Sequence, residues 1–338
     1  MRVYGRRKVL ALAAGVLAAA TACTGNAPPP TSKAPATPSA SPSPTAPAVA
    51  ITQAEAAQEF FKITVTDDRL RVKSPLQGRL AMAVDQTMGG QTELTKAAFL
   101  STGNAPLRHK WGTPTLFVPR WAPNEPAPWF SAVATRDGSP ALLTFAKSDG
   151  WRLSSVALLL PGQQLPEFQR DADGYVTALA SDDKSITISP QFMGPVHASV
   201  AETGSAGVTA GLVAAGPYTT DVAEQIASLR EKAKNDGFSY DSIFSPDSFP
   251  VYALRTKDGG ALIQYSLSRT TSTTTKTAED DYIPVPESAR WAISTPVLRR
   301  TLRLIETHQY ASVVPSLKAP APAAVIAHDG ALTRASGQ

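Results

Sequence analysis

The residues of this chain that are best suited to chemistry are one cysteine, Cys23, and four histidines, His109, His197, His308 and His328. A catalytic nucleophile needs a base within hydrogen-bond reach, and a metal needs several ligands that the fold brings together. No histidine has a second histidine or a carboxylate at metal-ligand spacing, and the HExxH pattern is absent. We therefore expect a surface position for each histidine and no catalytic role.

Other chemical motifs are incomplete. The GxSxG, GxGxxG and Walker patterns are absent. Asp171-Ala172-Asp173-Gly174 begins like the calcium loop of an EF-hand, but Asp182 stands at the twelfth place, where a glutamate should close the loop. This stretch therefore predicts a tight turn. The sequence predicts no catalytic residue, no bound metal and no cofactor.

Aromatic side chains gather in one stretch, and three of them, Trp121, Trp129 and Phe130, are candidates for facing a ligand. Core packing is the simpler explanation for such a group. The alternative is a partly open pocket, because an aromatic wall with a few polar groups suits an apolar ligand or a glycan. Trp121 precedes the turn sequence at 123–126, so we expect it to be the most exposed of the three.

The first 22 residues have the pattern of a secretory signal. Four basic residues between Arg2 and Lys8 precede an apolar run at 9–20, and the small residues Ala20-Thr21-Ala22 lead to Cys23. This ending resembles the lipobox of bacterial lipoproteins, although many lipoboxes carry leucine at the position of Ala20. The resemblance implies cleavage before Cys23 and acylation of that residue, for example with palmitate. It also implies anchoring at the extracytoplasmic face of the bacterial cell membrane.

Residues 23–50 form the predicted lipid attachment site and a stalk. The segment is rich in Pro, Ala, Ser and Thr and has one charge, Lys33, so we expect it to be disordered. The basic residues of the signal supply all of the net charge of +4. The mature chain is therefore close to neutral, which argues against nucleic acid as a partner.

The remaining sequence predicts an α+β fold in two units, at 51–190 and 191–338. In the first unit a capping box, Thr52 with Glu55, opens a helix, and further helices are expected at 76–87 and 91–100. Strands follow at 116–118, 129–135, 141–146 and 151–160, with Asp-Gly turns between the last three. The second unit repeats this order. Its helix at 219–238, capped by Asp221, precedes strands at 250–256, 261–268, 309–314 and 323–327, and a mobile loop is expected at 279–286.

The repeated order suggests an internal duplication. The stretch Trp129–Gly138 is similar to Phe249–Gly259, and each is followed by Ala-Leu. Two unrelated units or one mixed sheet are the alternatives.

The chain resembles a group of uncharacterised secreted lipoproteins from high-GC Gram-positive bacteria. The resemblance rests on the lipobox-like start, the stalk, Pro119-Arg120-Trp121, Trp151-Arg152-Leu153 and the stretch Tyr252–Leu262. The layout of helices and a curved sheet also resembles NTF2-like cones, more loosely. Membership of this group would imply a cellular location and an architecture, but it implies no reaction.

We therefore expect a membrane-anchored, non-enzymatic protein that binds a cell-wall component, a partner protein or an apolar ligand. The alternative is an enzyme or small-ligand binder with an aromatic-lined pocket inside such a cone, where one buried carboxylate with a raised pKa acts as a general base.

Overall fold

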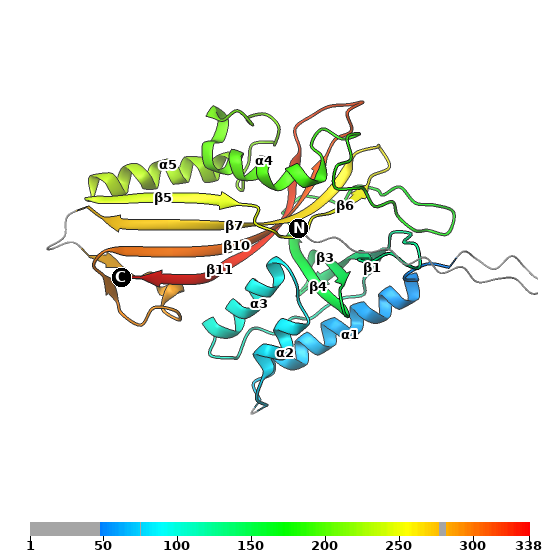
Figure 1. The fold of residues 1–338 in the computed structure, drawn as a ribbon, viewed down its shortest axis with the longest axis horizontal. Helices are drawn as coiled ribbons and strands as arrows, with labels where there is room; N and C mark the ends of the chain where they lie inside the picture. Colours follow the sequence, from blue (N-terminus) through cyan, green and yellow to red (C-terminus); the bar gives the residue numbers. More distant parts are fainter. Residues whose placement is uncertain (1–47, 75, 277–281) are drawn as a thin grey trace, which may run out of the picture. The chain divides into compact units, whose positions relative to one another are not determined.

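A computed structural model describes residues 48–74, 76–276 and 282–338, and residues Pro47–Gln338 form one compact unit (Figure 1). Cys23, the signal and the stalk as far as residue 47 lie outside the described residues. Residues 48–50 are described, and the Ala50 amide donates to the Trp121 carbonyl at 3.1 Å. Within the described ranges, no helix has the length and apolar character needed to cross a membrane.

Three helices precede the first strands. They are α1 (Gln53–Arg71), α2 (Arg79–Asp85) and α3 (Gly90–Ser101), which confirms all three expected helices. The capping box is confirmed as well, because the Glu55 amide donates to the Thr52 hydroxyl while the Thr52 amide donates to the Glu55 carboxylate. Phe60 and Ile63 bury the inner side of α1.

The next four strands are β1 (Thr115–Phe117), β2 (Trp129–Arg136), β3 (Ser139–Lys147) and β4 (Trp151–Leu159). They pair antiparallel in chain order, as expected. Asp137 and Gly138 make the two-residue turn between β2 and β3, and both have positive φ, 52° and 90°. Such turns follow the twist of the strands, which explains the preference for Asp-Gly at this place.

The second half begins with two helices, α4 (Pro190–Thr203) and α5 (Thr220–Asn235). α4 was not predicted from the sequence, and its interior contains Gly194 and Pro195. The capping role expected for Asp221 is wrong, because α5 starts after Thr219 and has no side-chain cap.

Seven strands complete the chain. They are β5 (Phe238–Ser245), β6 (Tyr252–Arg255), β7 (Ala261–Thr275), β8 (Ile283–Pro284), β9 (Val297–Leu298), β10 (Thr301–Val314) and β11 (Ala324–Gly337). The hairpin between β6 and β7 is confirmed. β5 was missed, and β7, β10 and β11 are longer than expected. Residues 277–281, in or beside the loop that we expected to be mobile, lie outside the described residues.

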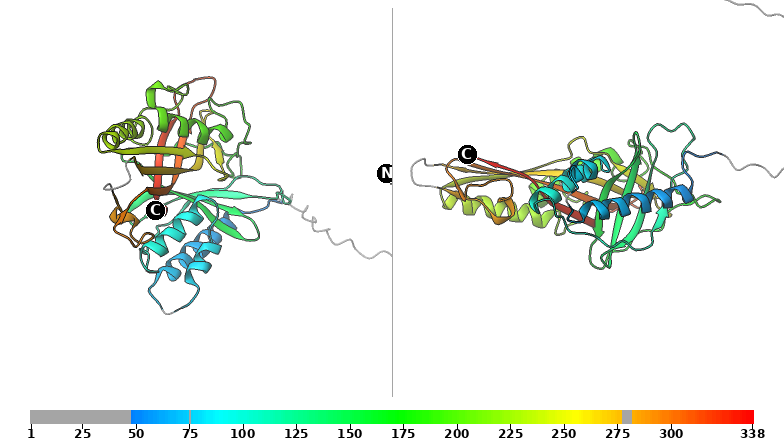
Figure 2. Two further views of the ribbon diagram at one scale, coloured as in Figure 1. Left: turned by 60° about the vertical axis from the view of Figure 1, so that its left-hand side comes forward. Right: turned by 90° about the horizontal axis from the view of Figure 1, so that it is seen from below.

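Nine strands form one antiparallel sheet in the order β1-β2-β3-β4-β11-β10-β7-β5, with β6 also paired to β7. The sheet curls back on itself. Three strands, β4, β11 and β10, lie between β3 and β7 in the sheet, yet the Thr144 hydroxyl of β3 donates to Oε1 of Gln264 in β7 at 2.6 Å. Helices α4 and α5 pack on one face of β7 and β10, and the β1–β4 half packs on the other (Figure 2).

The fold is therefore α+β, as predicted. The boundary expected near residue 190 falls between β4 and α4, while the sheet continues across it through the pairing of β4 with β11. The division into two units and the internal duplication stay predictions.

Candidate functional site

The three candidate ligand-facing aromatics lie in or beside the core. Phe130 is fully buried and stacks on Phe145 with ring centroids 4.9 Å apart, and Trp129 is 8% exposed. Trp121 is half-buried, and its Nε1–H donates to the carbonyl of Trp129 at 2.7 Å. Packing thus accounts for Phe130 and Trp129, and only Trp121 retains exposed surface for a ligand.

The stretch beginning at Asp171 is the tight turn that we predicted. The Asp171 carboxylate accepts from the amides of Asp173 and Tyr175, and Arg120 pairs with both Asp171 and Asp173. Across the described residues, no group of three or more His, Cys, Asp or Glu side chains could hold a metal ion.

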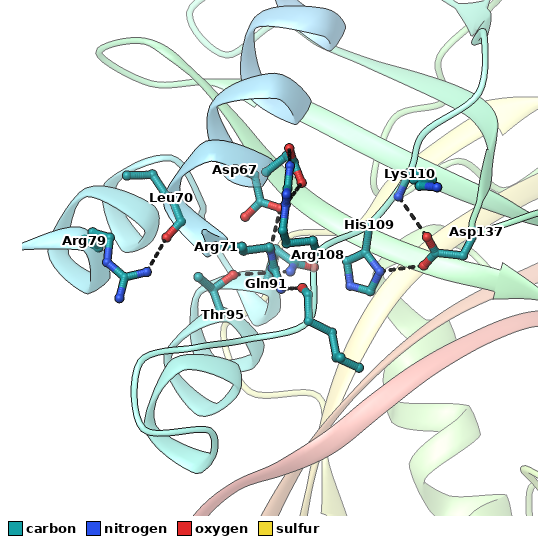
Figure 3. Close-up of polar contacts among 12 residues, drawn as sticks. Asp67, Leu70, Arg71, Arg79, Gln91, Thr95, Arg108, His109, Lys110 and Asp137 are labelled. Carbon is teal, nitrogen blue, oxygen red and sulfur yellow. Dashed lines mark hydrogen bonds and ion pairs between the residues drawn. The ribbon is translucent and has the colours of Figure 1, made fainter. Parts of the chain in front are cut away.

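A surface pocket of about 490 Å³ lies between α1 and the segment 108–111. Figure 3 shows Arg108, His109, Lys110 and Asp137, which belong to its lining. It combines apolar groups with ion pairs. Phe61 and Val65 on α1 are about half exposed, and Trp111 is half-buried. The lining residues are Phe61, Thr64, Val65, Asp68, Arg108, His109, Lys110, Trp111 and Asp137. A volume of this size suits a small molecule or a few residues of a polymer.

Two buried arginines position this segment. Arg79 donates to the carbonyls of Leu70, Val72 and Asn104, at 2.7 to 2.9 Å, and so joins the end of α1 to the turn after α3. Arg71 pairs with Asp67 at 2.6 Å and donates to the Leu107 carbonyl at 3.0 Å. Residues 104–107 are thereby fixed to α1, and residues 108–111 follow directly (Figure 3).

Asp137 holds the other side of the pocket from the tip of the β2–β3 hairpin. Its carboxylate lies 2.8 Å from His109 Nδ1 and accepts from the Lys110 amide at 2.8 Å. Across the pocket, the Arg108 guanidinium makes two hydrogen bonds to Asp68 of α1. Each acid is thus matched to a partner that fixes its orientation.

These contacts keep both acids ionised. The Arg108 hydrogen bond lowers the pKa of Asp68, and the Lys110 amide, followed by His109, lowers the pKa of Asp137. Among the described carboxyl groups, each one whose pKa clearly departs from its ordinary value has it lowered. The two carboxylates of the pocket are therefore ionised, and no described carboxyl group shows the clearly raised pKa that the enzyme alternative requires.

A second cluster contains the other three histidines, on the face of the sheet that α4 covers. The surface position expected for His197 is wrong, because this residue of α4 is fully buried. Its Nε2–H donates to the Tyr218 carbonyl at 2.6 Å, so its Nδ1 accepts from the Tyr265 hydroxyl at 2.8 Å. Burial lowers the pKa of His197 to about 4.

His308 and His328 meet across β10 and β11. His308 Nδ1 lies 3.0 Å from His328 Nε2, so the two rings share one proton in a hydrogen bond. Tyr218 stacks on His328 with centroids 4.1 Å apart. Burial, followed by the charge of His308, lowers the pKa of His328 to about 3. This pairing was invisible in the sequence because it depends on strand register, which places His328 opposite Tyr310.

Known proteins place the chain in a family. The family described as a domain of unknown function, DUF8094, matches residues 48–337. An uncharacterised lipoprotein of Streptomyces avermitilis is 28% identical over 144 residues, which is 40% of each chain. An uncharacterised lipoprotein of Streptomyces coelicolor is 28% identical over 232 residues, which is 66% of this chain and 63% of that protein.

The matches therefore span less than two thirds of the length of either relative. No solved structure matches the chain. The relatives confirm the resemblance to lipoproteins of high-GC Gram-positive bacteria, and the family match covers nearly all of the described residues. The chain belongs to the DUF8094 family.

Proposed function

We propose that the protein is a lipid-anchored, non-enzymatic binding protein on the extracytoplasmic face of the cell membrane, and that its ligand is a neutral glycan of the cell wall. The anchor is the acylated Cys23, and residues 24–50 form a stalk that lets the folded part reach the wall. The names of the two relatives support the lipoprotein part of this proposal.

The pocket between α1 and residues 108–111 is the observation that carries the binding role. A sugar ring has an apolar face, which suits Trp111 and Phe61, and hydroxyl edges, which suit charged donors and acceptors. The Asp68–Arg108 pair offers both. Because the cations Arg108 and Lys110 balance the carboxylates of Asp68 and Asp137, the pocket favours a neutral polar ligand over a strongly charged one.

Metabolic labelling tests the anchor. Cells given a clickable palmitate analogue should label the native chain and should not label the Cys23→Ala variant. A label that persists in the variant would contradict lipidation at Cys23.

Binding to soluble glycan strands, released from host cell wall by muramidase, tests the pocket. With the full chain in neutral detergent, we expect Trp111→Ala and Arg108→Gln each to weaken binding about tenfold or more, as for central residues of other interfaces. Trp291→Ala, which changes a tryptophan of another pocket, is the matched control and should bind as the native chain does. Equal binding by all four chains would refute the proposal for this pocket.

A further inference from the structure

Another pocket, of about 330 Å³, lies between the end of α3 and the β10–β11 hairpin. Leu100, which is 48% exposed, and Trp291 supply its apolar surface together with Ile305. Two arginines, Arg303 of β10 and Arg334 of β11, line the same pocket and are exposed. Apolar surface beside two guanidinium groups distinguishes this pocket from the charge-balanced one at α1.

A β-bulge aims the side chains of β11 into this pocket. The register between β10 and β11 shifts between Ile305 and Glu306, so that Arg334 stands opposite Ile305 and Leu332 opposite Glu306. Thr333 is the extra residue, and both Thr333 and Arg334 line the pocket. Bulges re-aim side chains in this way and are frequent beside binding sites.

The charges of the pocket favour an anion. Arg303 stands opposite Ser336, two positions from Arg334, so the two arginines are diagonal neighbours on adjacent strands and line the same pocket. Like charges so placed repel one another, and an anion between them removes the repulsion. Glu93 of α3 pairs with Arg334 at 3.3 Å, but it also pairs with Lys96. The described charges around the pocket are therefore positive on balance.

We propose that this pocket binds a small organic acid: one carboxylate or phosphate held by Arg303 and Arg334, with an aromatic or short apolar body against Trp291 and Leu100. The acid is a free small molecule rather than a membrane lipid, because the volume lies at the lower end of the range for small-molecule sites. The site is separate from the glycan pocket and does not depend on it.

Two probes of nearly equal shape test the proposal, 4-(trifluoromethyl)benzoate and its neutral amide. Fluorine NMR with the full chain in neutral detergent measures the binding of each. We expect the native chain to bind the benzoate about tenfold or more tightly than the amide, because hydrogen bonds to a charged group are the stronger ones. Equal affinity for the two probes, or no binding of the benzoate, would overturn the proposal.

Variants locate the site. The double variant Arg303→Gln with Arg334→Gln should lose the preference for the benzoate and bind the amide as before. Trp291→Ala should weaken both probes, and Trp111→Ala, in the other pocket, should weaken neither. An unchanged preference in the double variant overturns the proposal, provided its thermal unfolding matches that of the native chain. Displacement of the benzoate by phosphatidylglycerol in the micelles would overturn the assignment to a free acid and point to a lipid headgroup.

Discussion

Mild acid is expected to destabilise this fold through two histidines, the buried His197 and the half-buried His328. His197 and His328 have pKa values of about 4 and about 3 in the folded chain, against an ordinary value of 6.5. Between these values the unfolded chain binds protons that the folded chain does not. Stability is therefore fully present above the ordinary pKa and is lost as the pH falls toward the folded values.

The size of the effect follows from the difference between the pH of the solution and the ordinary pKa of histidine. At about pH 5 an unfolded histidine is protonated, and keeping it neutral in the fold costs about 1.5 pH units, or about 2 kcal/mol. His197 and His328 together should lower the free energy of unfolding by about 4 kcal/mol, a large part of the stability of a typical domain. The carboxyls with lowered pKa values lose their contribution only in stronger acid, so this interval isolates the histidines.

Urea unfolding at about pH 7.5 and about pH 5, followed by tryptophan fluorescence, measures the difference. In the His328→Gln variant we expect the difference in the free energy of unfolding between the two pH values to fall by about half, because only one of the two histidines, His197, remains. His109→Gln removes a histidine of the surface pocket and serves as the matched control. A native chain that is equally stable at both pH values would refute the reasoning, as would a pH dependence that His328→Gln leaves unchanged.

Two further predictions concern packing. Phe130→Ala should lower the free energy of unfolding by about 3–5 kcal/mol, because it leaves a cavity in the core, whereas Phe61→Ala, at a position 48% exposed, should cost about 1 kcal/mol or less in the same urea titration. Gly330→Ala should cost about 1–3 kcal/mol, because its Cβ would lie 2.5 Å from His308 Nδ1, while the same change at Gly150, which has no neighbour within 4 Å, should be nearly neutral; equal costs at the two glycines would contradict the close approach.

Local signals in the sequence predicted a large part of this fold. The Thr52–Glu55 capping box and the Asp137-Gly138 turn each depend on residues within a few positions of one another, and both formed as expected. Their geometry is decided by backbone preferences that operate in any context.

Elements that depend on distant partners were missed. α4 contains Gly194 and Pro195, which disfavour a helix. The helix forms because its own side chains Met193 and Val200 pack into the hydrophobic core. β5 was assigned to no element beyond Phe238, where the expected helix ended, because its strand conformation depends on its pairing with the distant β7. The bulge at Thr333 has no signal in the sequence at all, although it decides which face of β11 carries Arg334.

The histidines show how the same limit applies to function. Spacing along the chain argued against contact among these histidines, because His197, His308 and His328 are far apart in sequence. Strand geometry reverses that conclusion, since residues opposite one another on paired strands are neighbours whatever their separation along the chain. The antiparallel register brings His328 beside Tyr310 and within 3.0 Å of His308, and α4 adds His197 from above. Strand register, and not spacing along the chain, thus decides which side chains meet in such a sheet, and here it brings together histidines of which two have strongly lowered pKa values.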